Sequence, residues 1–499
     1  MGMAIKRGLV IVMGLLLQIL LTLALYMFFI NQLAIIHVVY SIIGLLITLY
    51  LIKDSKNYSY TLPWIVILLL FPLIGALLYI ILGRNKYRSK TLKSIVKHEN
   101  ESKKYLIQDN QIRKEYEKNG RIRYLSDFTG YPVSRNNKID YYPLGELAFE
   151  VMIEELKKAE KFIFFEYFIV AHGKMWNSIL EILEEKAKQG VDVRVMYDDL
   201  GCIALLPKNY PQELEKKGIK CVAFNRLNAF AGVIMNNRDH RKILIIDGKV
   251  AFSGGINIAD EYINIGSKYG HWKDNGIRVV GDAVWNYTVM FLTMWNSFRE
   301  EDIDFNVFKY NFKENQRVNG FVVPYGETPL DNELTGEDIY LNIINQANDY
   351  VYIFTPYLII DTDMINALNL AAKRGVDVRI VIPGIPDKKL VYTVSESYVE
   401  PLVNGGVKVY RYIPGFVHSK VFVADDHIAT VGTINMDYRS LYLHFECGCY
   451  MEDVDVINDI KKDLLDSIDK SSLITKEEAT PKFLKAFLQA MLRLVAPLM

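Results

Sequence analysis

The sequence predicts an α/β protein in which N-terminal transmembrane helices are followed by two pseudo-symmetric lobes, each built on an α/β sheet. Three observations predict this fold: apolar runs fill the first 83 residues, the remainder contains an internal repeat, and helix and strand patterns alternate within each copy. The chain has 499 residues, of which 51% are hydrophobic and 23% charged. This length exceeds the size at which a single core usually stops growing, and the composition excludes a disordered protein.

Three apolar runs open the chain, at residues 8–30, 33–52 and 61–82. Each has the roughly 20 residues that a helix needs to cross the core of a bilayer. The first run is too long for the apolar part of a signal peptide, and no cleavage site with small residues follows it. We therefore expect a membrane anchor of two or three transmembrane helices over residues 1–90, and a connector over residues 91–125.

The charges around the anchor predict its orientation. Only Asn31 and Gln32 separate the first two apolar runs, so the number of complete spans stays open. Loops that are rich in Lys and Arg usually lie on the cytoplasmic side of the membrane. Six of them follow the third run: Arg84, Lys86, Arg88, Lys90, Lys93 and Lys97. We expect a multi-pass protein of the cell membrane whose lobes are cytoplasmic.

The charge balance of the remaining chain weighs against nucleic acid as a partner. Residues 1–83 hold four basic and one acidic side chain, which leaves 54 basic and 57 acidic ones over residues 84–499. A surface that binds phosphate backbones is usually strongly basic. Four cysteines in so long a chain do not form a disulfide framework, and we expect Cys447 and Cys449 to be structural.

The region after the anchor contains two copies of one unit. Residues 190–195 (GVDVRV) match residues 375–380 (GVDVRI), and residues 240–257 match residues 418–435. In each copy an amphipathic helix ends at a glycine, and a strand rich in β-branched residues follows. The expected boundaries are residues 126–305 for the first lobe, 306–318 for a linker, 319–480 for the second lobe and 481–499 for a C-terminal amphipathic helix. That helix carries Lys482, Lys485 and Arg493, and it either lies on anionic lipid or docks on the second lobe.

Each copy contains one His-x-Lys-x-x-x-x-Asp motif. Residues two apart on a strand face the same side, so each His and its Lys point together, while the Asp lies at the turn and fixes the hairpin. Two copies in register within a repeat indicate a site. We predict as its catalytic residues His240, Lys242 and Asp247 of the first copy with His418, Lys420 and Asp425 of the second. The motifs are followed by Gly-Gly-x-Asn257 and Gly-Thr-x-Asn435.

These motifs resemble those of the phospholipase D superfamily, although Thr433 stands where the family pattern has Ser. The N-terminal segment is similar to the membrane anchor of bacterial cardiolipin synthases, through Thr61–Trp64, Phe71–Gly75 and Gly83–Arg84. Tyr438–Ser440, Thr355–Tyr357 and Ala496–Leu498 are also similar to that subfamily, so the resemblance covers the whole chain. It implies two phospholipase-D-like lobes with the active site between them.

The resemblance implies a phosphatidyltransferase that joins two phosphatidylglycerols into cardiolipin and releases glycerol, with neither a cofactor nor a metal. His240 would form a phosphohistidine intermediate, and His418 would protonate the leaving alkoxide and then deprotonate the incoming alcohol. The donors to the phosphoryl oxygens would be Lys242, Lys420, Asn257 and Asn435.

The family usually supplies an orienting carboxylate downstream of each motif. Asp274 stands 34 residues after His240, and Glu446 stands 28 residues after His418. We predict that these two carboxylates orient the motif histidines and fix their tautomers.

Three alternatives remain open from the sequence. The same motifs suit a membrane-bound phospholipase D that hydrolyses phospholipid to phosphatidic acid or transfers it to another alcohol. They also suit a membrane-tethered phosphodiesterase or nuclease, and a scaffold without activity is the third alternative. The expected partners are phosphatidylglycerol, cardiolipin and the lipid bilayer, without nucleic acid, and self-association into a homo-oligomer is left open.

The remaining polar residues are expected to play supporting roles. Asp198, Asp199, Asp361 and Asp363 fall where strands run into loops, so solvated turns are favoured over a metal site. The apolar segment within residues 225–239 is a hypothetical lipid gate. We expect His98 to be exposed, and His172, His271, His427 and His444 to be structural or to lie behind the site.

Overall fold

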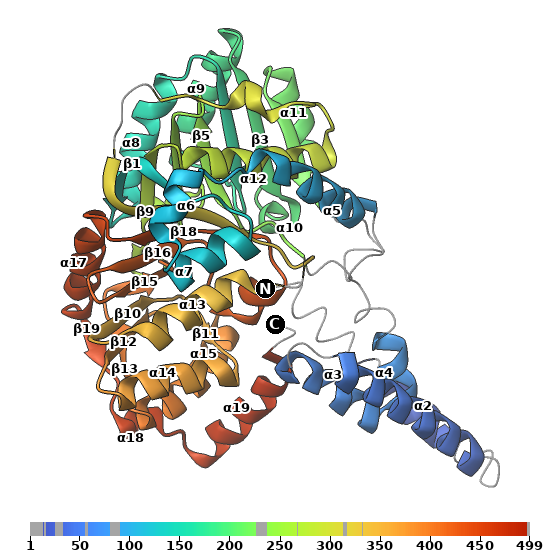
Figure 1. The fold of residues 1–499 in the computed structure, drawn as a ribbon. Helices are drawn as coiled ribbons and strands as arrows, with labels where there is room; N and C mark the ends of the chain where they lie inside the picture. Colours follow the sequence, from blue (N-terminus) through green and yellow to red (C-terminus); the bar gives the residue numbers. More distant parts are fainter. Residues whose placement is uncertain are drawn as a thin grey trace. The chain divides into compact units, whose positions relative to one another are not determined.

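The computed structural model describes residues 13, 16–24, 33–54, 58–79, 90–225, 237–266, 268–312, 317–331 and 333–496. The chain forms two compact units, which are Met1–Lys86 with Ala490–Met499, and Tyr87–Gln489 (Figure 1). The hypothetical gate lies mostly outside the described residues, as do Arg84, Lys86 and Arg88 of the basic segment.

In the first unit, the helices between residues 33 and 78 pack through small and aromatic residues. A side chain at Gly75 would meet the backbone of Leu68, and the ring of Trp64 meets that of Tyr79 edge-on at 5.5 Å. Most of the first apolar run lies outside the described ranges. Within those ranges, none of the helices meets both requirements for a membrane crossing, sufficient length and sufficient hydropathy. The helices are α2 (Leu33–Asp54), α3 (Tyr58–Leu70) and α4 (Pro72–Leu78).

A sheet of 15 strands runs through both lobes in the part of the second unit that the structure describes. Its order is β19-β13-β12-β10-β15-β16-β18-β9-β1-β8-β6-β5-β2-β3-β4. The strands of the first lobe are β1 (Ser134–Tyr142), β2 (Phe162–Tyr167), β3 (Asp192–Asp198), β4 (Lys220–Phe224), β5 (Lys242–Ile246), β6 (Val250–Gly254) and β8 (Gly276–Gly281). Those of the second lobe are β9 (Arg317–Glu327), β10 (Tyr350–Phe354), β12 (Asp377–Pro383), β13 (Lys408–Tyr412), β15 (Val421–Ala424), β16 (Ile428–Gly432), β18 (Glu446–Glu452) and β19 (Ser471–Leu473).

The strand pairing is the same in the two copies, which gives the predicted pseudo-symmetry. In the first lobe β2, β3 and β4 are parallel, and the hairpin of β5 and β6 is antiparallel to β2. In the second lobe β10, β12 and β13 are parallel, and β15 and β16 form the corresponding hairpin. The glycines that end the preceding helices, Gly190 and Gly375, adopt φ of 90° and 96°, which other residues rarely adopt. The two lobes are therefore an α/β repeat joined through β8, β1, β9 and β18.

Helices cover both faces of this sheet (Figure 1). Helix α12 is buried along almost its whole length and belongs to a core that extends into both lobes. The helices of the first lobe are α8 (Gly145–Lys157), α9 (Lys174–Lys188), α10 (Asp199–Cys202), α11 (Tyr210–Lys216) and α12 (Val284–Phe298). Those of the second lobe and the C-terminus are α13 (Thr335–Gln346), α14 (Thr362–Lys373), α15 (Lys389–Asn404), α16 (Tyr438–Tyr442), α17 (Val456–Ile468), α18 (Lys476–Ala479) and α19 (Phe483–Val495).

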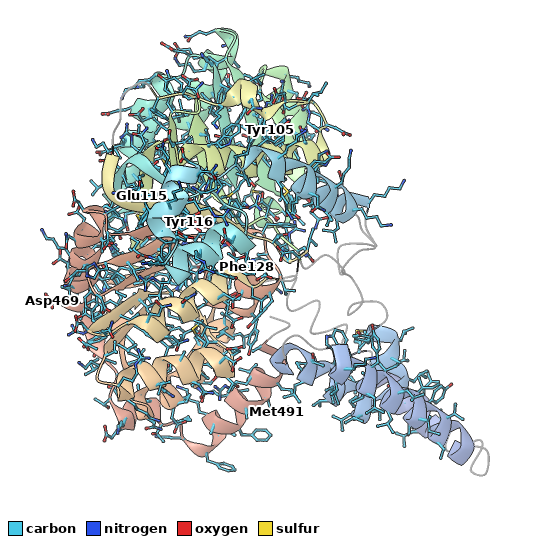
Figure 2. All side chains as sticks on the ribbon, in the orientation of Figure 1. Tyr105, Glu115, Tyr116, Phe128, Asp469 and Met491 are labelled. Atoms are coloured by element: carbon cyan, nitrogen blue, oxygen red, sulfur yellow. The ribbon has the colours of Figure 1, made fainter. Side chains whose placement is uncertain are left out.

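The connector packs on both lobes through its aromatic and charged residues. Tyr105, labelled in Figure 2, stacks on Phe305 at 4.6 Å, and Arg121 pairs with Glu452 at 3.0 Å. The expectation that His98 is exposed is wrong: its side chain is buried because α5 packs against α12. The connector helices are α5 (Lys90–Ser102), α6 (Asn110–Tyr116) and α7 (Gly120–Arg123).

Candidate active site

Each motif histidine enters its strand beside a segment of the other lobe. The backbone N–H of His240 donates to the carbonyl of Phe445 at 2.9 Å, and that of His418 donates to the carbonyl of Lys273 at 2.7 Å. The second contact is extended by a parallel pair of short strands, β7 (His271–Lys273) and β14 (Gly415–Val417). The residue after each of these carbonyls carries the carboxylate, so each carboxylate is held against the histidine of the opposite copy.

The two carboxylates contact the histidines in the exchanged pairing. His240 Nδ1 lies 2.8 Å from Glu446 Oε2, and His418 Nδ1 lies 2.7 Å from Asp274 Oδ2. The order of residues along the chain placed Asp274 with His240 and Glu446 with His418, and the structure corrects that pairing. The reason is the pairing of backbone segments across the lobe interface, which no spacing within one copy reveals. Each half of the site is therefore completed by the other lobe.

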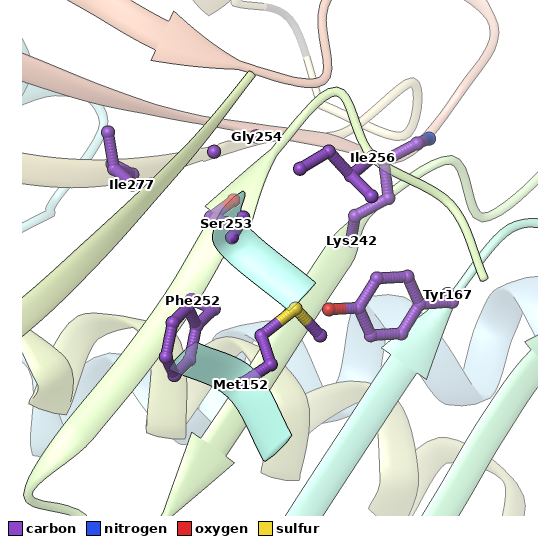
Figure 3. A pocket seen from close by; sticks show the side chains of 10 residues that line it. Met152, Tyr167, Lys242, Phe252, Ser253, Gly254, Ile256 and Ile277 are labelled. Atoms are coloured by element: carbon purple, nitrogen blue, oxygen red, sulfur yellow. The ribbon is translucent and has the colours of Figure 1, made fainter. Parts of the chain in front are cut away.

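Both motif lysines are buried beside their histidines. Lys242 Nζ donates to the carbonyl of His240 at 2.7 Å, and Lys420 Nζ donates to the carbonyl of His418. Burial lowers the pKa of Lys242 to about 8 and that of Lys420 to about 7. Figure 3 shows a small pocket under the Lys242 stem, with the ammonium group pointing away from Met152. The two ammonium groups are thus concentrated at the histidines and cost free energy until an anion pairs with them.

Burial also keeps the two imidazoles neutral. It lowers the pKa of His240 well below its ordinary value, and the nearby Lys242 ammonium adds to the effect. Burial and then Lys420 lower the pKa of His418 to about 4, although Asp274 opposes this shift. A neutral imidazole has a free lone pair on one ring nitrogen, which is what a nucleophile at phosphorus requires.

Aromatic rings form the walls that desolvate the histidines. Phe168 lies 4.8 Å from the His240 ring, and Tyr262 and Trp272 lie 5.3 and 5.6 Å from the His418 ring, measured between centroids. These aromatic residues were not predicted from the sequence. Trp272 could have been, because it stands between two polar residues and two places before Asp274.

The motif aspartates lie at the far ends of the strands from the histidines. Asp247 accepts hydrogen bonds from the backbone N–H groups of residues 160–162, and Asp425 accepts from those of residues 348–350. They therefore hold each hairpin against the start of the neighbouring parallel strand. Their prediction as catalytic residues is corrected by this geometry, and the expected role in the hairpin is the one that fits.

The two motif asparagines differ in their surroundings. Asn257 accepts from the backbone N–H of Ile169 at 3.0 Å and donates to the Tyr262 hydroxyl at 2.8 Å. Asn435 Oδ1 is buried without a hydrogen-bond partner among the described residues. Each asparagine still has an N–H that can donate to a phosphoryl oxygen, as the resemblance implies.

Other polar residues support the site from behind. Thr433 donates to Glu446 Oε2 at 2.5 Å, so the hydroxyl at this departure from the family pattern is used. Asp198 caps α10 and pairs with the buried guanidinium of Arg238 at 2.7 Å, which places Arg238 under the backbone of the first motif. The cap fits the expected turn, but the expectation that Asp198 is solvated is wrong, because its side chain is fully buried. Arg238 was not singled out from the sequence.

Comparisons with known proteins identify the family of this chain. Residues 152–268 and 340–467 match the family model "Cardiolipin synthase, PLD-like domain", and residues 34–84 match "Phospholipase_D-nuclease N-terminal". The chain is 34% identical to "Cardiolipin synthase 1" of Staphylococcus aureus strain COL, over 91% of this chain and 94% of that protein. It is 33% identical to "Cardiolipin synthase" of Clostridium perfringens strain ATCC 13124, over 89% of this chain and 95% of that protein. The solved structure of phosphatidylserine synthase from Haemophilus influenzae is similar in fold, with a TM-score of 0.60 and 15% identity over 76% of this chain and 100% of that one.

Proposed function

The chain belongs to the cardiolipin synthase family of phospholipase-D-like proteins, and from this premise we propose that it is a phosphatidyltransferase that converts two phosphatidylglycerols into cardiolipin and glycerol. The observation that carries the proposal is the buried pair of exchanged His–carboxylate contacts, with one lysine beside each histidine. This arrangement offers two imidazoles of fixed orientation with a cation beside each, and the charge of Lys420 also acts on His240. That is what a two-step displacement at a phosphodiester needs.

In the first step His240 attacks phosphorus of the donor phosphatidylglycerol. Glu446 holds Nδ1 of His240, which leaves Nε2 as the attacking atom. A P–N bond forms, the P–O bond to the glycerol headgroup breaks, and His418 gives its proton to the departing glycerol oxygen. In the free site, burial and the charge of Lys420 disfavour the protonated form of His418. The negative charge of the bound phosphodiester stabilises that form.

In the second step a free hydroxyl of the acceptor phosphatidylglycerol replaces the histidine. His418, neutral after the first step, takes the proton of that hydroxyl, and the new P–O bond forms as the P–N bond breaks. Cardiolipin leaves, and His240 and His418 return to their starting states. Lys242 and Lys420 stabilise the phosphoryl oxygens in both transition states, because charge accumulates there.

Membrane association is part of the proposal, because both substrates are lipids. Helix α19 supports it: Phe483, Leu484 and Phe487 are 90%, 79% and 62% exposed, which is unusual for three large apolar side chains within five residues. Lys485 on the same helix pairs with Glu396 of α15 at 3.0 Å, so the start of the helix is tied to the second lobe. We therefore favour contact of this apolar face with lipid over docking on the lobe, and we place the lobes on the cytoplasmic side.

The test is lipid mass spectrometry after the purified full chain is incubated with phosphatidylglycerol alone. We expect cardiolipin and glycerol in equal amounts, and neither product from His240→Ala or His418→Ala. His427→Ala is the matched control, because His427 is exposed and pairs only with Asp453 in the part of the chain that the structure describes. Phosphatidic acid in place of cardiolipin would show that water is the acceptor and would replace this proposal by a phospholipase D. Cardiolipin from either motif variant would contradict the two-histidine mechanism.

A further inference from the structure

A third histidine lies beside the His240 half of the site, and the mechanism above does not use it. His444 is 8% exposed, and its ring centroid lies 5.5 Å from that of His240. Neither of its ring nitrogens has a hydrogen-bond partner among the residues that the structure describes. A buried polar group without a partner loses its hydrogen bonds to water and gains none in return, so such a group calls for an explanation.

The backbone holds His444 firmly at this place. Its N–H donates to the carbonyl of Arg439 at 2.9 Å, and the N–H of the next residue, Phe445, donates to the carbonyl of Arg238 at 2.8 Å. The side chain is thus fixed at its base while the ring lacks polar contacts.

Glu446 supplies a second unused atom at the same point. Its Oε2 is occupied by His240 Nδ1 and the Thr433 hydroxyl, whereas its Oε1 has no hydrogen-bond partner among the described residues. That Oε1 lies 3.6 Å from His444 Nδ1, which is too long for a hydrogen bond. The two atoms therefore face each other across a gap that no hydrogen bond bridges.

The set of three matches the ligands of a zinc ion. One ligand atom from each of His240, His444 and Glu446 lies within 4.8 Å of the others, and all three residues are buried. Zinc binds imidazole nitrogen and carboxylate oxygen at roughly 2.0–2.2 Å, and two His with one Glu and an open fourth position is a known donor set. Tetrahedral ligands at that radius are about 3.4 Å apart, so a pair separated by the full 4.8 Å must close by about 1.4 Å when the ion binds.

We propose that His240, His444 and Glu446 form a binding site for one Zn²⁺ ion, and that its occupancy reversibly inhibits the enzyme. The ion uses the lone pair of His240 and draws Glu446 away from orienting that ring, so the nucleophile is lost while the metal is bound. The inhibition rests on the function proposed above, whereas the existence of the site does not. Lys242 and Lys420 are not ligands and remain in place, so removal of the metal restores the site.

The experiment measures binding and activity separately, on the full chain without a histidine tag and treated with a chelator. Zn²⁺ is titrated into the protein by calorimetry and by competition with a chromophoric chelator. The wild type should bind one ion per chain, and His444→Gln should weaken that binding by more than tenfold, at least the loss typical of removing a partner of a metal ligand. His427→Gln, at an exposed histidine, should bind like the wild type.

Activity is then followed against Zn²⁺ concentration, with each protein normalised to its own metal-free rate. Zn²⁺ should inhibit the wild type and His427→Gln, a chelator should restore the rate, and the inhibition midpoint of His444→Gln should rise by the same factor as its dissociation constant. If His444→Gln is inactive, the binding titration alone decides whether the site exists. Equal Zn²⁺ affinity in wild type and His444→Gln, or no bound ion, would overturn the proposal. Stoichiometric binding without inhibition would refute only the inhibitory role, and a chain that binds zinc but makes no cardiolipin would refute the proposed function alone.

Discussion

The two halves of the site come from copies of one repeat, yet their carboxylates are in opposite states. Burial raises the pKa of Glu446 well above its usual range, so the group beside His240 is held neutral. Burial also acts on Asp274, but its hydrogen bond with His418 and the nearby Lys420 ammonium outweigh it, and the pKa of Asp274 is lowered. An ionised partner stabilises an imidazolium, whereas a neutral partner does not.

This difference assigns different tasks to two histidines that the motifs leave almost equivalent. His240, beside a neutral carboxyl and near two lysines, is kept as a neutral imidazole and suits the nucleophile. His418, beside the Asp274 carboxylate, is the imidazole that can accept and return a proton during the reaction. We therefore keep the assignment that the family resemblance implied, now with an electrostatic reason for it.

The largest effect is expected from neutralising one carboxylate at a time. Asp274→Asn removes the charge that stabilises protonated His418, and kcat should fall by about 10²–10⁴. Glu446→Gln replaces a neutral carboxyl by an amide of similar shape, so the loss should be only about 10–10². Both values come from initial rates of cardiolipin formation at saturating phosphatidylglycerol. Equal losses, or a larger loss for Glu446→Gln, would contradict the claim that Asp274 is charged and Glu446 neutral.

A smaller effect is expected on the pH dependence of stability. The folded-state pKa of His418 is about 4, below the unfolded value near 6.5, so the unfolded chain binds a proton in this window that the folded chain does not. The stability is therefore complete above pH 6.5 and falls as the pH drops toward 4. His418 should account for about 2 kcal/mol of the loss between pH 7 and pH 5.

Thermal unfolding of the wild type and His418→Gln at these two pH values measures this contribution. Tm should drop less on acidification in His418→Gln, and it should drop as in the wild type in His427→Gln. An identical acid-induced drop in Tm for wild type and His418→Gln would show that His418 is not held neutral by burial.

The smallest effect is expected at the motif aspartates, where the two lobes again differ. Asp247 is buried and Asp425 is half-buried, although each accepts from three consecutive backbone N–H groups. Asp247→Ala should cost about 2–3 kcal/mol of stability and Asp425→Ala about 1 kcal/mol, because water can replace the lost acceptor only at the exposed turn. The shift in Tm measures both, and transfer activity below the melting range should persist. Loss of activity without a drop in Tm would show that these aspartates are catalytic, as the sequence predicted.

The sequence predicted the repeat and the hairpins, because these depend on short-range patterns. The positive φ of Asp247 and Gly248 at the first turn follows from an Asp-Gly dipeptide, for example. The convergence of the two motifs was an implication of the family resemblance. The pairing of Asp274 with His418 depends on backbone contacts between segments 144 residues apart, which no local pattern encodes. The burial of His98 and the unpartnered ring of His444 likewise depend on packing between elements distant in sequence.

The central claim, that His240 is the nucleophile and His418 the proton carrier, is tested most directly with phosphatidyl-p-nitrophenol. Its leaving group departs as a stable phenolate, so the first step needs no proton from His418. The account predicts that His418→Ala releases a burst of one p-nitrophenolate per chain and retains the lipid as a phosphohistidine at His240, while His240→Ala shows no burst. A burst from His240→Ala with the lipid bound to His418 would contradict the account.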